Sequence, residues 1–158
     1  MSDSATPLET AAESPATEED GDPTAAALAE ALSAEHAAVY GFEFIGGAAE
    51  DEDRRDRASE AAYQHKALRD ALHEAAVERD IDPPSALSSY PLPEGRSGED
   101  MDSFAADLET TSVDAYLWLS ASADTDLRTT AARSLQEATV RSLEWGAELD
   151  PLPGFGES

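Results

Sequence analysis

The chain contains no cysteine, which excludes disulfide bonds, thiolate metal ligands and thiol nucleophiles together. It also has no run approaching the roughly 18 consecutive apolar residues that a membrane-spanning helix needs. Its first residues carry acids where a signal peptide would carry lysine or arginine. We therefore expect a cytoplasmic protein that does not enter a membrane.

Basic residues are scarce, with 10 lysines and arginines against 35 aspartates and glutamates and a net charge of -25. Such a surface repels nucleic acid and anionic lipid. Glycine-rich phosphate loops and Ser/His/Asp constellations are also missing, which disfavours nucleotide enzymes and serine hydrolases. The acidity itself has two open interpretations, adaptation to a high-salt cytoplasm, where salt screens self-repulsion, or solubility alone.

Residues 1–22 contain seven acids, no base and few large apolar side chains. Such a segment cannot bury enough surface to order itself, so it is interpreted as a disordered acidic leader. The remaining residues, 23–158, are long enough for one domain with a core, and we expect them to form a single domain.

Four segments of this domain have apolar residues at steps of three and four, which predicts helices, and none alternates with the period of a strand. The predicted helices are about 23–46, 53–79 and 102–121, and a fourth from Asp124 to a stop before Pro151. The stripe of the first helix is Leu28, Leu32, Glu35, Val39 and Phe42, and that of the second is Ala58, Ala61, His65, Leu68, Leu72 and Ala75. Two of the stripes therefore contain a polar side chain.

The linker over residues 80–101 contains four prolines and cannot be helical throughout. An extended chain of that length reaches about 70 Å, enough to return along a helix of about 36 Å. The first and third connections are short, so each joins antiparallel neighbours. The sequence thus predicts an all-α, ferritin-like four-helix bundle of two antiparallel hairpins joined by a long proline-rich crossover, with a C-terminal tail at 150–158.

Several short segments add a resemblance. They are Ala34 to Tyr40 (AEHAAVY), Tyr63-Gln64-His65 with Arg69 to Leu72, Tyr90 to Pro93, Leu108-Glu109, and Ala138 to Arg141 with Trp145. Together they resemble an uncharacterised, alanine-rich, ferritin-like domain-of-unknown-function family, over about Ala25 to Phe155. The resemblance implies the fold and supplies no function, because the family has no established activity.

Ferritin-like di-iron proteins carry a glutamate on each of two helices and a Glu-x-x-His motif on each of the other two. No glutamate of the helical segments here has a histidine three residues later, and the fourth segment has no histidine. There, Arg133, Glu137 and Arg141 are spaced as a solvated ladder of ion pairs. The standard di-iron ligand set is therefore incomplete.

The candidate site comprises Glu35, His36, Tyr63, His65 and Glu109, because an ionised carboxylate on a core stripe needs a partner. One interpretation is a buried hydrogen-bond network that fixes helix register, in a non-catalytic protein without a cofactor that acts by self-association or by binding a partner. The alternative is an oxidoreductase that binds iron, manganese or zinc through Glu35, His65 and Glu109.

Some apolar side chains exceed what one helix face can bury, notably Tyr116, Leu117 and Trp118 in the third segment and Phe44 in the first. They predict a homodimer interface or a surface for a protein partner. Equally open is coverage within the chain, by the crossover and the tail from Pro151 to Phe155.

Overall fold

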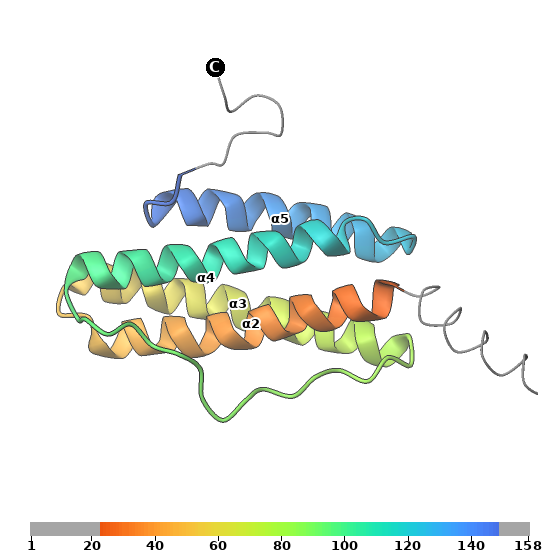
Figure 1. Ribbon diagram of the computed structural model, residues 1–158, viewed down its shortest axis with the longest axis horizontal. Coiled ribbons are helices and arrows are strands. Elements are labelled where there is room, and N and C mark those ends of the chain that lie inside the picture. The colour runs from red at the N-terminus through yellow and green to blue at the C-terminus, as the bar shows by residue number, and fades with distance from the viewer. Residues whose placement is uncertain (1–22, 149–158) are drawn as a thin grey trace, which may run out of the picture.

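The computed structural model describes residues 23–148, and all regular secondary structure in that range is helical. Four helices form a bundle (Figure 1): α2 (Pro23–Ala48), α3 (Glu52–Glu78), α4 (Gly98–Leu119) and α5 (Thr125–Glu144). The prediction of an all-α four-helix bundle is confirmed.

Short turns join α2 to α3 and α4 to α5, so each pair forms an antiparallel hairpin. Residues 79–97 connect the hairpins as a long strap that runs the length of the bundle (Figure 1). Helix α2 packs against both α3 and α4, and α4 packs against α5. Within residues 23–148, α3 and α5 lack comparably close backbone packing, so the bundle has one open side.

Helix boundaries differ from the predicted ones at several places, including the end of α4, which lies at Leu119 and not at residue 121. Helix α4 begins at Gly98, because Ser97 and Asp100 form a reciprocal capping box that starts the helix before the predicted residue 102. Helix α2 runs past its predicted end at residue 46 and continues to Ala48. Helix α5 ends at Glu144, and Gly146 follows with a φ of 102°. The predicted leader 1–22 and tail 150–158 lie outside the described residues.

Small residues let the two central helices approach each other closely. A Cβ added at Gly41 on α2 would lie 2.5 Å from Leu108 Cδ1 and 3.1 Å from the Phe104 ring, both on α4. A larger residue at Gly41 would therefore require the Leu108 side chain to shift and the Phe104 ring to move slightly. Alanines make up much of the buried surface of α2 and α3 in the same way.

The apolar core is divided into two clusters along the bundle. One gathers around Leu32, Leu72 and Leu119. The other gathers around Phe42, Met101 and Trp145. A layer of buried polar side chains lies between them along the sequence of each helix, and this layer is the candidate site.

Paired arginines tie the helices together towards the ends of the bundle. Arg54 of α3 binds Asp102 of α4 through two hydrogen bonds of 2.8 and 3.1 Å. Arg79, which caps α3, binds Asp124, which caps α5, through bonds of 2.7 and 3.3 Å. Forked pairs of this kind fix orientation as well as distance. None of the four helices in residues 23–148 has both the length and the apolar character that crossing a membrane would take.

Candidate functional site

Three ionisable side chains from three helices lie completely inside the bundle. Glu35 of α2, His65 of α3 and Glu109 of α4 each have 0% of their surface exposed. Their positions follow from the helical stripes, since each occupies a core step in an otherwise apolar row. The structure therefore brings together the three residues that were predicted as a polar cluster or metal site.

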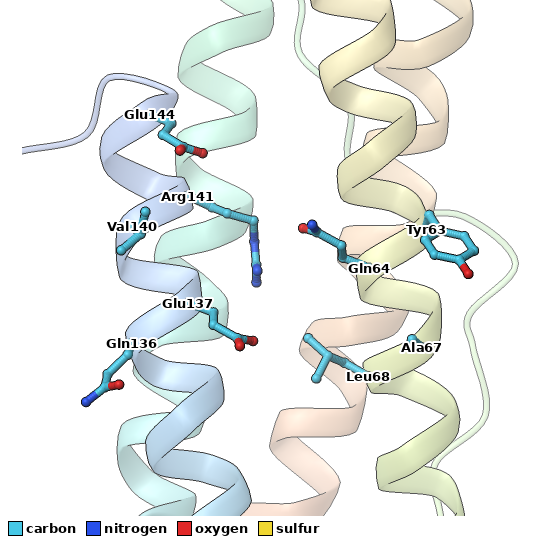
Figure 2. Close-up of a pocket in the computed structure, with 9 residues that line it drawn as sticks. All are labelled: Tyr63, Gln64, Ala67, Leu68, Gln136, Glu137, Val140, Arg141 and Glu144. Carbon is cyan, nitrogen blue, oxygen red and sulfur yellow. The ribbon is translucent and has the colours of Figure 1, made fainter.

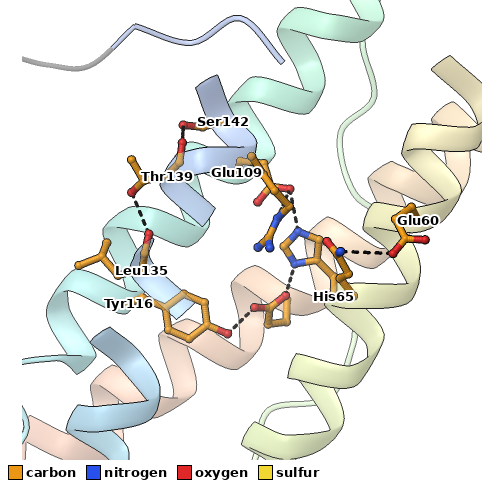
Figure 3. Close-up of polar contacts among 10 residues, drawn as sticks. Glu60, His65, Glu109, Tyr116, Leu135, Thr139 and Ser142 are labelled. Carbon is orange, nitrogen blue, oxygen red and sulfur yellow. Dashed lines mark hydrogen bonds and ion pairs between the residues drawn. The ribbon is translucent and has the colours of Figure 1, made fainter. Parts of the chain in front are cut away.

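His65 lies between the carboxylates of Glu35 and Glu109, and Figure 3 shows its contact with Glu109. Its Nδ1 is hydrogen-bonded to Oε1 of Glu35, and its Nε2 lies 2.9 Å from Oε2 of Glu109. The ring also stacks against Phe42, with ring centroids 5.4 Å apart and planes 8° from parallel. Both ring nitrogens are therefore engaged, and the ring orientation is fixed.

Two further side chains extend this arrangement at its ends. The Tyr116 hydroxyl, on α4, donates to Oε2 of Glu35, and Nε of Arg141, on α5, donates to Oε2 of Glu109 at 3.0 Å. We call the resulting chain of five side chains the polar network: Tyr116, Glu35, His65, Glu109 and Arg141. Its members come from all four helices, so it joins the two hairpins at mid-bundle.

The network is electrically balanced at neutral pH. Burial alone lowers the pKa of His65, but its hydrogen bonds to Glu109 and Glu35 and their negative charges outweigh burial and raise the pKa from 6.5 to about 9. His65 is therefore an imidazolium that donates from both nitrogens. Two carboxylates then face two cations, His65 and Arg141, which removes the cost of an unpaired buried charge.

Tyr116 remains a neutral hydrogen-bond donor in this setting. Burial and the adjacent negative charge of Glu35 raise the pKa of its hydroxyl well above its usual value of 10.0. The neutral phenol can donate to the carboxylate, whereas a phenolate beside it would be repelled. Tyr116 thus donates a hydrogen bond to Oε2 of Glu35 without adding charge to the network.

Two residues predicted for the cluster lie elsewhere. Tyr63 is 73% exposed, and His36 binds the carbonyl oxygen of Pro84 in the strap at 3.2 Å. Helical geometry explains both errors, because Tyr63 precedes His65 by two residues and so points about 200° away, while His36 follows Glu35 by one and points about 100° away. Neither belongs to the polar network.

Arg141 was assigned from the sequence to a solvated ion-pair ladder, and this assignment was wrong. Its side chain is 13% exposed and reaches Glu109 in the core. The missed signal was its position between Ala138 and Ser142, two small buried residues that leave room for a long side chain.

The ligand arrangement does not suit a metal ion. The His65 ring separates the two carboxylates and uses both nitrogens to bind them, so the three groups do not converge on one point. Within residues 23–148, no three His, Asp or Glu side chains are placed to hold an ion together. Buried alanines, Ala62 and Ala138, stand three residues before His65 and Arg141, where a Glu-x-x-His motif would carry its glutamate.

A groove opens over the network on the side where α3 and α5 are not closely packed (Figure 2). Its main part has a volume of about 690 Å³, and a second part of about 320 Å³ shares three lining residues with it. We call both parts together the α3–α5 groove. Residues that line it include Asp56, Arg57, Glu60, Tyr63, Gln64, Ala67, Leu68, Glu137, Val140, Arg141 and Glu144.

Arg141 connects the groove to the network. In Figure 2 its side chain extends from α5 towards α3, where Gln64 points back at it. The Nε of Arg141 is bound to Glu109, whereas its Nη2 has no hydrogen-bond partner among the described residues. The guanidinium is therefore anchored in the core through Nε, its Nη2 is buried without a partner, and other parts of Arg141 line the groove.

The residues that were predicted to form an interface differ in their exposure. Tyr116 is fully buried in the network, so its assignment to an interface was wrong. Phe44 packs edge-on against Phe104 and beneath the Arg96 guanidinium of the strap, which covers it within the chain. Leu117 and Trp118 remain 58% and 45% exposed, because they follow Tyr116 by one and two residues and so point outward.

Comparisons with known proteins agree with this architecture. A conserved hypothetical protein, rv2844, from Mycobacterium tuberculosis has a solved structure that is similar, with a TM-score of 0.73 and 27% identity, over 78% of this chain and 94% of that one. None of the curated proteins matches the chain. The model of a domain of unknown function, DUF4439, matches residues 27–157. The chain therefore belongs to the DUF4439 family of domains of unknown function.

Proposed function

We propose that this chain is a non-catalytic binding domain, in which the polar network is structural and the α3–α5 groove receives the ligand. One observation carries the proposal: both ring nitrogens of His65 are occupied by buried carboxylates. A histidine held in this way has no free nitrogen for a metal ion or for proton exchange with a substrate. Its position favours a role in holding the helices.

The arrangement of the network supports a structural role. It takes at least one side chain from every helix, and two of its bonds cross between the hairpins, from Tyr116 to Glu35 and from His65 to Glu109. A buried network that is charge-balanced fixes which residues face each other, since any shift in register would leave a charge unpaired.

Two features of the groove support a binding role, its volume and the fixed position of an arginine that lines it. A volume of about 690 Å³ lies within the range of small-molecule sites in proteins. Its base includes Arg141, whose position is fixed by Glu109. A binding surface is more precise when its side chains are locked by a second set of contacts.

The metal-dependent alternative rests on the likeness of the bundle plan to the ferritin-like fold. Iron, manganese or zinc would have to displace the hydrogen bonds of His65 to both glutamates, and His65 would have to lose its proton. The hydrogen bonds of both His65 nitrogens to Glu35 and Glu109 do not favour such a site.

Elemental analysis of tag-free protein, purified without chelator, tests the proposal. The wild type and a variant with Glu35→Ala and His65→Ala are compared. We expect no stoichiometric iron, manganese or zinc in either protein, with the variant less stable. About one metal per chain in the wild type, absent from the variant, would refute the structural role of the network.

Self-association through the outer face of α4 is a second candidate. The exposed side chains of Leu117 and Trp118 favour it. The net charge of -25 opposes contact between copies, so association should strengthen with salt. Sedimentation at low and high salt, with a Leu117→Ser and Trp118→Ser variant as the control, would detect it. A monomer under both conditions would exclude this candidate.

A further inference from the structure

The walls of the α3–α5 groove carry more carboxylates than cations. On this basis we infer that its ligand is an organic cation with an apolar body, of the arylalkylamine or alkylamine class. The inference rests on the proposed binding role of the groove. It adds the chemical class of the ligand.

Four carboxylates line the two parts of the groove, namely Asp56, Glu60, Glu137 and Glu144, and all four residues are exposed. The first two belong to α3 and the others to α5. Negative charge therefore borders the groove on both walls. A cation entering between the helices would be attracted from two sides.

The two lining cations are already committed to other partners. Arg57 donates to the backbone oxygen of Glu144 at 2.9 Å and lies over the Trp145 ring at 4.0 Å. Arg141 is paired with Glu109. Arg57 keeps its positive charge and offsets one of the four wall carboxylates, whereas the charge of Arg141 is balanced by Glu109, so the groove has a net negative charge, within a chain that is itself strongly acidic.

Apolar surface lies between the charges. Ala67 and Leu68 on α3 face Val140 on α5, which is 54% exposed, whereas the Tyr63 ring points away from α5 (Figure 2). The combination fits a molecule with one charged end and an apolar remainder.

An anionic ligand has less support. It would have to pass the four carboxylates to reach Arg141, whose charge is balanced by Glu109. Charge complementarity therefore favours the cation.

Three probes of matched shape test the inference on the full chain: 4-phenylbutylamine, 4-phenylbutanol and 4-phenylbutyrate. Calorimetry gives their affinities, and methyl NMR shifts of Leu68 and Val140 report whether binding occurs in the groove. We expect the amine to bind most tightly and the carboxylate least. The preference should shrink in 1 M salt.

Variants separate the ligand class from the groove itself. Glu137→Gln with Glu144→Gln should weaken amine binding by about three-fold per charge removed, leaving the alcohol unchanged. Asp107→Asn with Asp114→Asn is the matched control, because it removes two exposed carboxylates of α4 that lie outside the groove, and it should change nothing.

The outcomes are distinguishable. Equal binding of all three probes, or tightest binding of the carboxylate, would overturn the cation inference and leave the binding function standing. No shift at Leu68 or Val140 with any probe would overturn both. Ala67→Trp, which fills the groove at an exposed position, should abolish binding of every probe if the site is correct.

Discussion

Each of the two hairpins pairs a buried carboxylate with a cation, but the cation is a histidine in one hairpin and an arginine in the other. In each, the first helix supplies a buried glutamate and the second supplies the cation that faces it: Glu35 with His65 in the first hairpin, Glu109 with Arg141 in the second. The first pair is completely enclosed. The second is enclosed only at Glu109, because Arg141 reaches the groove.

The two ion pairs therefore differ in how they respond to pH. A histidine can lose its proton, so the first pair is sensitive to pH, whereas an arginine stays charged under all ordinary conditions. Because His65 also binds Glu109, the two pairs are joined, and Glu109 is the acceptor on which both cations depend. The loss of unfolding free energy caused by a substitution in the network should therefore increase with the number of charged partners that it leaves unpaired.

The largest effect is expected from Glu109→Ala. It leaves two buried cations, His65 and Arg141, without their shared acceptor, and breaking a buried pair typically costs about 3–5 kcal/mol of unfolding free energy. Urea unfolding followed by circular dichroism measures the loss. Asp107→Ala, at an exposed carboxylate two residues earlier on α4, is the control and should stay within about 0.5 kcal/mol of wild type.

The pH dependence of stability should follow from His65. Its pKa is about 9 in the folded chain and 6.5 as an ordinary histidine, so the folded state holds the proton more tightly. The stabilisation, on the order of 3 kcal/mol, is fully present below pH 6.5 and is lost as pH rises through 9. Unfolding free energies measured from about pH 6 to 10 test this.

A His65→Gln variant is the control for that titration. It should be less stable at low pH and should lack the slope between pH 6.5 and about 9, since glutamine does not titrate. An equal slope in the variant would assign the pH dependence to other groups and would contradict the raised pKa of His65.

A smaller effect is expected from Arg141→Met. Glu109 keeps its bond from His65, and the groove-facing end of the arginine side chain is already partly solvated, so we expect a loss of about 2 kcal/mol, below that of Glu109→Ala. The same urea titration measures it. A loss equal to that of Glu109→Ala would mean that His65 contributes nothing to holding this carboxylate.

The smallest effect on stability is expected from Ala67→Trp in the groove. Ala67 is exposed, so its replacement should change the unfolding free energy by no more than about 0.5 kcal/mol. Thermal unfolding beside wild type checks this. A large loss would indicate that α3 and α5 close against each other in solution, and that the groove is not an open surface.

The bundle was predictable from the sequence because helical periodicity alone places Leu28, Glu35 and Phe42 on one face. The same periodicity placed Glu35 and His65 inside, whereas Glu109 was expected beside the core stripe of its helix and is fully buried. The capping box at Ser97 was readable as a local motif and was missed, since the prolines before it suggested a longer irregular strap.

Other features depended on information that spacing does not carry. Arg141 shares a helical row with Glu137 and Arg133, so local pairing seemed sufficient, and only its distance to Glu109 shows where it points. The groove is also a tertiary feature, because it arises where α3 and α5 fail to pack. Proximity in the sequence misplaced Tyr63 and His36, whose neighbours are buried but whose own directions differ.

The central claim is that His65 is protonated at neutral pH and bridges two carboxylates, and nitrogen NMR of its imidazole tests this most directly. At about pH 7.5 we expect both ring nitrogens to be protonated, to titrate together near pH 9, and to be unchanged by added Zn²⁺. A ring nitrogen that is unprotonated at that pH, or that shifts when about one equivalent of Zn²⁺ is added, would contradict the claim.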